Sequence, residues 1–186
     1  MPRRSDNKQG ALKVTNNSLD LAVAGVGMFI TASPDDGSIS YTRDGSFLID
    51  REGVLMTTDK RRVLNELGET IVIPPQKVDE SGMTSLLDTI QINNRGRIQL
   101  AYGDGSIVEV GNVGLARFGN IAGLKPAGNA QFVTTEKSGP AIVGVPMADS
   151  YGQVIQGHLE ASNAIVTDEL VKLCLLYTSD AADDVE

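Results

Sequence analysis

The folding pattern is clearest in one stretch of the chain, Tyr41-Thr42-Arg43-Asp44-Gly45-Ser46-Phe47-Leu48-Ile49-Asp50-Arg51-Glu52-Gly53. It predicts a strand, a tight turn at Asp44-Gly45, a second strand and another turn at Glu52-Gly53. Glycine takes positive φ without steric cost, and aspartate accepts hydrogen bonds from its own turn. Because successive side chains of a strand face opposite sides, we expect Phe47 and Ile49 in the core.

The same pattern of short apolar runs and turns continues on both sides of this stretch. Further strands are expected at 19–24, 28–32, 39–42, 54–56, 63–64, 71–73, 90–92, 97–102, 107–110, 113–118, 131–134 and 154–160. Pro34 to Gly37 predicts a turn, whereas residues 1–17 lack periodicity and residues 78–85 form a polar connection. Turns at this spacing are typical of an all-β domain. The sequence therefore predicts a mainly β fold, a meander of short antiparallel strands.

Composition limits the classes of function. The 186 residues suffice for one domain or one and a half, and the absence of Trp with only 4% aromatic residues predicts a core of Val, Ile, Leu and Ala. The formal net charge of −8 argues against a nucleic-acid surface, which needs clustered Lys and Arg. The two small basic groups, Arg3-Arg4 and Lys60-Arg61-Arg62, are interpreted as solvated turns.

Targeting and redox signals are also few. The first residues contain no apolar segment of the kind found in cleaved secretory signals, and no run approaches the ~18 apolar residues of a membrane-spanning helix. Cys174 is the only cysteine, so an internal disulfide is not possible.

The residue types required for catalysis are scarce. His158 and Cys174 are the only histidine and thiol, and they fall on different expected elements, so His158 is interpreted as an ordinary strand residue. A zinc site needs more such ligands than these two. Two carboxylates of a glycosidase could meet in the fold, but the chain offers little aromatic surface for stacking a sugar. We therefore expect no catalytic residues, no cofactor and no metal.

Two glycine-containing patterns have simpler interpretations than ligand binding. Gly25-Val26-Gly27 begins like a dinucleotide fingerprint, but no helix is expected after it, so it is interpreted as a break between strands. Asp36-Gly37, Asp44-Gly45 and Asp104-Gly105 lack the ligand spacing of a calcium loop. They are interpreted as turns.

The spacing of apolar residues changes from that of a strand to that of a helix only near the end of the chain. Asn163 or Thr167 is a candidate helix cap, with acidic residues in the first turn that follows. Val166, Leu170 and Leu173 then form one apolar stripe at helical spacing. This stripe has two open interpretations, a seam with another chain and an amphipathic helix that folds back onto its own domain.

Four segments, taken in order, resemble motifs of the bacterial flagellar axial proteins, the hook and rod subunits. Asn17 to Phe29 is similar to "N-x-L-D-L-A-x-x-G-x-G-F-F", and Tyr41 to Phe47 to "Y-T-R-x-G-x-F". Val113 to Gly128 is similar to "L-A-x-F-x-N-x-x-G-L-x-x-x-G", and Gly157 to Asn163 to "G-x-L-E-x-S-N". The motifs look closest to the hook protein, whereas the short middle of the chain is more like a rod protein.

The resemblance implies a structural subunit of the flagellar hook or distal rod that polymerises into a hollow helical tube for motility. It implies export through the flagellar type III apparatus without a cleaved signal peptide, to the basal body or hook outside the inner membrane. The implied partners are copies of itself and neighbouring axial proteins, with no nucleic acid and no small-molecule ligand. Alternatives are a β-rich extracellular binding or adhesion module and a carbohydrate-active enzyme.

The resemblance also divides the chain. Residues 1–16 form a polar lead-in without the family's N-terminal helix, 17–161 a wall domain of the hook and rod type, and 162–173 the start of a short, truncated C-terminal helix. Residues 174–186 do not resemble the family and look like read-through of a sequencing adapter. Because the terminal helices would drive assembly, we expect these 186 residues alone not to polymerise.

Candidate subunit contacts come from two places in the chain. One is the side of the opening stretch that faces away from the core, Arg43, Ser46 and Asp50, which we expect to be exposed. The other is the helical stripe of Val166, Leu170 and Leu173.

Overall fold

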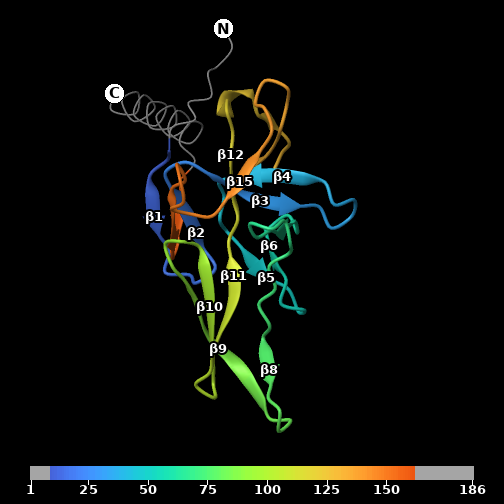
Figure 1. Ribbon diagram of the computed structural model, residues 1–186, viewed down its shortest axis with the longest axis vertical. Coiled ribbons are helices and arrows are strands. Elements are labelled where there is room, and N and C mark those ends of the chain that lie inside the picture. The colour runs from blue at the N-terminus through green and yellow to red at the C-terminus, as the bar shows by residue number, and fades with distance from the viewer. Residues whose placement is uncertain (1–8, 162–186) are drawn as a thin grey trace, which may run out of the picture.

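The computed structural model describes residues 9–161, which fold into four antiparallel β-sheets and one 3-10 turn (Figure 1). In chain order the elements are β1 Leu12–Val14, β2 Leu21–Ala24, β3 Met28–Ala32, β4 Ile39–Thr42, β5 Leu48–Ile49, β6 Leu55–Met56, β7 Arg62–Val63, β8 Gln76–Val78, β9 Thr84–Ile92, β10 Arg97–Tyr102, β11 Ile107–Asn112, β12 Leu115–Arg117, η1 Ile121–Gly123, β13 Lys125–Pro126, β14 Gln131–Val133, β15 Ile142–Gly144, β16 Gln153–Gln156 and β17 His158–Glu160. The mainly β prediction is confirmed.

The largest sheet has nine strands, in the order β13-β14-β4-β3-β7-β6-β5, with β12 joining β3 to β15. Its centre is the β3–β4 hairpin, in which Phe29 pairs with Thr42 and Ala32 with Ile39. The turn between these strands is closed by the amide of Ser33, which donates to the carbonyl of Ser38 over 2.9 Å. This confirms the turn predicted from Pro34 to Gly37.

The stretch Tyr41 to Gly53 contains one hairpin rather than two. The second turn is confirmed, since β5 pairs with β6 and Gly53 has a φ of +88°. The first turn, predicted at Asp44-Gly45, is wrong. The strand β4 pairs with β3 and β14, and Ser46 forms a bridge with Asp20. Gly45 does not have positive φ; a Cβ there would collide with the carbonyl of Leu21. A close approach to a distant segment, and not a local turn, requires this glycine.

The core confirms the alternation of side chains in β5 and its neighbours. Phe47 is 1% exposed and packs edge-on against Phe29 with the ring centroids 5.0 Å apart, whereas Leu48 is 51% exposed. Around this pair lie buried aliphatic side chains, among them Leu21, Val23, Leu55, Val63, Ile71, Ile73, Ile98, Leu100, Val113, Leu115 and Val154. Burial of this apolar surface is the main stabilising term of the fold.

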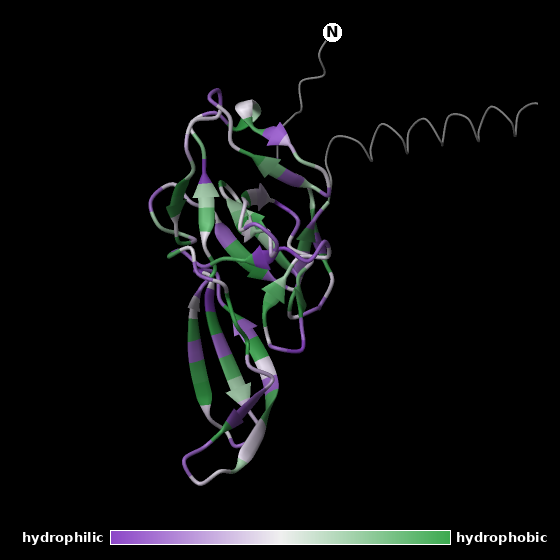
Figure 2. Ribbon diagram, turned by 90° about the vertical axis from the view of Figure 1, so that its right-hand side faces the viewer, coloured by the Kyte–Doolittle hydropathy of each residue, from purple (hydrophilic) through white to green (hydrophobic). Residues whose placement is uncertain are grey.

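A second sheet, ordered β11-β10-β9-β8, extends away from the first along the long axis (Figures 1 and 2). Its inner face is buried through Ile98, Leu100 and Tyr102, while Leu86 and Ile107 on the outer face are exposed. The polar connection expected at 78–85 is wrong at both ends, because Val78 belongs to β8 and β9 begins at Thr84. The strands β8 and β9 pair with each other on both sides of the turn at 79–82. This pairing extends both strands into polar residues, which show no alternation of apolar and polar side chains.

The side-chain amide of Gln156 connects this sheet to the rest of the domain through hydrogen bonds. Its Nε2 donates to the carbonyls of Ser18 (2.8 Å) and Ile90 (2.9 Å), and its Oε1 accepts from the amide of Ile92 (3.0 Å). Three segments distant in sequence are thereby joined by one side chain.

Both ends of the described chain lie in one place. The strand β1 pairs with β17, with Leu12 opposite Glu160 and Val14 opposite His158, and β16 pairs with β2. In Figure 1 the C-terminal strands, in red, lie beside β1 and β2 in blue. The sequence missed β1, because Leu12–Val14 sits in a polar segment. It also merged β16 with β17, which Gly157 separates with a φ of +73°.

The expected C-terminal helix at 162–173 and the tail at 174–186 lie outside the described residues. Among residues 9–161, no helix is long and apolar enough to cross a membrane.

Candidate functional site

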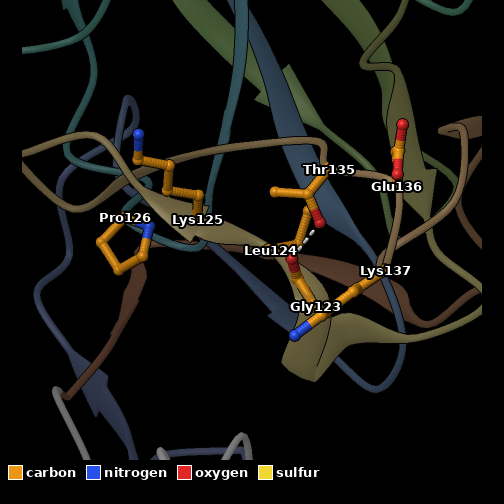
Figure 3. Close-up of a pocket in the computed structure, with 7 residues that line it drawn as sticks. All are labelled: Gly123, Leu124, Lys125, Pro126, Thr135, Glu136 and Lys137. Carbon is orange, nitrogen blue, oxygen red and sulfur yellow. Dashed lines mark hydrogen bonds between the residues drawn. The ribbon is translucent and has the colours of Figure 1, made fainter.

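One depression of about 560 Å³ lies between the segment after η1 and the segment after β14 (Figure 3). Its lining consists of Gly123, Leu124, Lys125, Pro126, Thr135, Glu136 and Lys137. The depression is open, and the hydroxyl of Thr135 already donates to the carbonyl of Gly123. The lining pairs no nucleophile with a base. In the part of the chain that the structure describes, no three His, Cys, Asp or Glu residues are grouped as metal ligands.

Among residues 9–161, the most heavily bonded polar group is the guanidinium of Arg43, in the loop after β4. Its Nε donates to Oε2 of Glu160 over 2.7 Å. Its Nη1 donates to the carbonyls of Gly25 (2.8 Å) and Gly27 (2.6 Å), and Nη2 to the carbonyl of Val23 (2.9 Å). The planar, five-donor guanidinium can satisfy several acceptors at fixed angles, which an ammonium group cannot.

Glu160 is the other half of this arrangement. Its side chain is 11% exposed, against 23% for Arg43. While Oε2 accepts from Arg43, Oε1 accepts from the backbone amide of Gly10 over 2.9 Å. The carboxylate thus connects the beginning of the described chain to the loop after β4. A charge-assisted bond of this kind is stronger than one between neutral groups.

Backbone bonds surround the ion pair. The amide of Ala161 donates to the carbonyl of Ala11 and that of Thr15 to the carbonyl of Gly157, each over 2.8 Å. The amide of Gly25 donates to Oε1 of Gln9, also over 2.8 Å. We call the three segments that meet here, residues 9–15, 23–27 and 157–161 with Arg43 between them, the terminal junction.

The structure places Arg43, Ser46 and Asp50 differently from the sequence-based expectation. All three are half-buried rather than exposed. The hydroxyl of Ser46 donates to Oδ1 of Asp44 over 2.7 Å. Oδ1 of Asp50 accepts from the amides of Glu52 and Val54 over 2.9 and 2.8 Å. Each side chain therefore has a partner within its own chain, and their role in subunit contacts stays a prediction.

The remaining predicted contact residues, Val166, Leu170 and Leu173, lie outside the described residues. Sequence reasoning missed Glu160 as the partner of Arg43. The available signal was charge, since Arg43 and Glu160 stand with opposite charges in two of the four motifs. Distance in sequence concealed the pairing.

The Asp-Gly pairs are part of a repeated turn. In each of Asp36, Asp44, Asp79 and Asp104, Oδ1 accepts from the amide of a serine two residues later. Hydrogen bonds lower the pKa of three of these carboxyls: backbone and side-chain bonds from Ser38 act on Asp36, and bonds led by the hydroxyls of Ser81 and Ser106 act on Asp79 and Asp104. These bonds confirm the turn interpretation at Asp36-Gly37 and Asp104-Gly105, whereas at Asp44-Gly45 the same serine bond forms without a tight turn.

Comparison with known proteins matches residues 22–100 to the family described as the flagellar hook protein FlgE/F/G D1 domain. The chain is 35% identical over 171 residues to the flagellar basal-body rod protein FlgG of Agrobacterium fabrum, a match that covers 91% of this chain and 60% of the relative. The chain is a member of the flagellar axial protein family. This confirms the family resemblance found in the four motifs.

Other relatives of this axial protein carry related names. It is 33% identical over 167 residues to FlgG of Borreliella burgdorferi, covering 89% of this chain and 58% of the relative. It is 31% identical over 165 residues to the rod protein FlgF of Caulobacter vibrioides, covering 89% and 58%. The chain thus spans about 60% of the length of the curated relatives it matches. A solved structure, the hook protein FlgE2 of Helicobacter pylori, aligns with a TM-score of 0.36 and 15% identity over 76% of this chain and 43% of that one, which is too little to support an argument.

Proposed function

We propose that this axial protein is a structural subunit of the bacterial flagellum, placed in the rod or hook of the basal body. One observation carries the proposal: similarity to basal-body rod proteins extends over 91% of the chain. The names of these relatives favour the rod over the hook. Copies of the subunit would assemble with one another and with neighbouring axial proteins into a hollow tube outside the inner membrane, after export without a cleaved signal peptide.

The build of the described part suits a structural role. Three of its four sheets contribute to one buried core cluster, and polar side chains such as Arg43 and Gln156 form hydrogen bonds between distant segments. Such cross-links make a domain stiff without preparing it for chemistry. The proposed contact residues on the wall domain are Arg43, Ser46 and Asp50. Those of a C-terminal helix that packs in coiled-coil fashion are Val166, Leu170 and Leu173.

Complementation would test this function. Residues 9–161 would replace the corresponding segment of FlgG in an Agrobacterium fabrum strain that lacks its own FlgG, with the host protein supplying the rest. The proposal predicts that the chimera restores swimming. As a matched control, the same chimera with Phe47→Ala, which removes a core side chain 1% exposed, should restore less. A chimera that is exported and folded yet leaves the cells without rods would contradict the proposal.

A further inference from the structure

We propose that Arg43 and Glu160 form a lock that fixes the two ends of the wall domain to each other and to the segment 23–27, so that the terminal junction opens and closes as one unit. The proposal rests on the proposed function only for its purpose, which is to hold the terminal segments of a subunit at a set angle to the wall. The contacts that form the lock all lie within this one chain.

The first step is the weakness of the strands at the junction. The β1–β17 pair has three residue pairs in its ladder and is a sheet of its own. An isolated two-stranded ribbon is marginally stable in water. Lys13 and Val14 of β1 are exposed, so apolar burial adds little here. The ribbon therefore needs another source of stability.

The second step is that Arg43 supplies bonds to both sides of the ribbon at once. Through Glu160 it reaches β17 directly, and through the other oxygen of Glu160 it reaches Gly10 ahead of β1. Its remaining donors hold three carbonyls of the segment 23–27, which begins in the buried strand β2. The lock ties a marginal ribbon to a segment anchored in the core.

The third step is the cost of opening the lock. If the ion pair separates, the partly buried carboxylate of Glu160 and the three carbonyls bound by Arg43 lose their partner together. Groups left unpaired in a partly buried place cost more than the bonds are worth in water. The bonds therefore break together, and residues 9–15 and 157–161 come away from the segment 23–27 and, as a marginal ribbon, from each other.

A second ion pair of the same chain provides a matched control. Nε of Arg97 on β10 lies 3.3 Å from Oε1 of Glu109 on β11, and the two side chains are 51% and 49% exposed. Exposed pairs of this kind contribute little to stability. Arg97→Lys thus repeats the chemical change of Arg43→Lys at a place without a lock.

Amide hydrogen exchange on the 186-residue chain tests the lock, with the wild type compared with Arg43→Lys, Glu160→Gln and Arg97→Lys. Arg43→Lys keeps the charge but loses the fork of donors. We expect it to speed exchange at the amides of Gly10, Thr15 and Ala161 by about tenfold or more, while the core amides of Leu64 and Ile71 change by less than about twofold. Glu160→Gln keeps one acceptor and should give a smaller increase at the same three amides. Arg97→Lys should leave all five unchanged.

Two results would overturn the proposal. One is unchanged exchange at Gly10, Thr15 and Ala161 in both junction variants. The other is equal acceleration at these amides and at Leu64 and Ile71, which would mean that Arg43 stabilises the whole domain and locks nothing. Failure of the chimera to form rods would count against the proposed function and leave the exchange result intact.

Discussion

The backbone of Leu21 lies directly against Gly45, whose carbonyl accepts a hydrogen bond from the Leu21 amide over 3.1 Å. A Cβ at position 45 would strike the carbonyl of Leu21. Leu21 is fully buried, so neither segment has room to withdraw. The contact holds the loop after β4 against the strand β2, next to the carbonyls that Arg43 binds.

Gly45→Ala should therefore destabilise the domain, by about 1–3 kcal/mol, as expected for overpacking of a filled site. Urea unfolding measures the loss. Gly103→Ala is the matched control, because Gly103 lacks positive φ and a Cβ there would meet only the Leu86 carbonyl at 3.8 Å. Equal midpoints for the two variants would show that the approach of Leu21 is not a constraint.

A second prediction follows from the alternation of buried and exposed side chains from Phe47 into β5. Phe47→Ala removes a buried ring that packs on Phe29 and should cost about 3–5 kcal/mol. Leu48→Ala, one residue later and 51% exposed, should cost less than about 0.5 kcal/mol. Thermal and urea unfolding of both variants would check the assignment of faces. Similar losses at the two positions would contradict it.

A third prediction comes from a buried polar network within the main sheet, between β3, β4 and β14. Oε1 of Gln131 accepts from the hydroxyls of Thr31 (2.9 Å) and Ser40 (2.7 Å). Gln131→Ala leaves both hydroxyls without this acceptor, so we expect a loss of about 1–3 kcal/mol. Combined with Ser40→Ala it should cost less than the sum of the two single changes, because the bond between them is lost only once. Strict additivity in a double-mutant cycle would show that the network is not coupled.

Acid titration provides a fourth prediction, from the turns at Asp79 and Asp104. Hydrogen bonds from Ser81 and Ser106 lower the pKa of these carboxyls in the folded state, against opposing effects that include the charge of Asp104 on Asp79. Because the folded pKa lies below the unfolded one, the stabilisation is present above the unfolded value of about 3.9 and is lost as pH falls through the folded pKa.

Ser81→Ala and Ser106→Ala should each raise the pKa of the neighbouring aspartate toward its usual value, as measured by NMR titration of the carboxyl carbons. The decline of stability below about pH 4 should become shallower in both variants. Titration curves identical with the wild type would show that the serine hydroxyls do not hold these carboxylates.

The sequence predicted those features of the fold that depend on residues close together in the chain. The β3–β4 hairpin, the turn before Gly53 and the burial of Phe47 all follow from alternation and turn chemistry within a few residues. The four motifs likewise predicted the family. These features need no knowledge of the rest of the chain.

The errors occurred where a distant segment determines the local conformation. Asp44-Gly45 has the composition of a hairpin turn, but Leu21 requires the glycine and β4 finds its partners elsewhere. Arg43 was expected to be exposed, because nothing near it in sequence reveals a partner 117 residues away. The strand β1 has no apolar pattern of its own, and pairing with β17 defines it.

Imaging of the flagellar axis would show whether this chain is built into it. Basal bodies would be isolated from the complemented strain and examined by electron cryo-microscopy. We predict a rod in which each position of the replaced FlgG shows a wall domain with the sheets of residues 9–161, joined at the terminal junction to the segments that FlgG supplies. Basal bodies that lack this domain, in cells that export and fold the chimera, would contradict the proposed place of the chain in the rod.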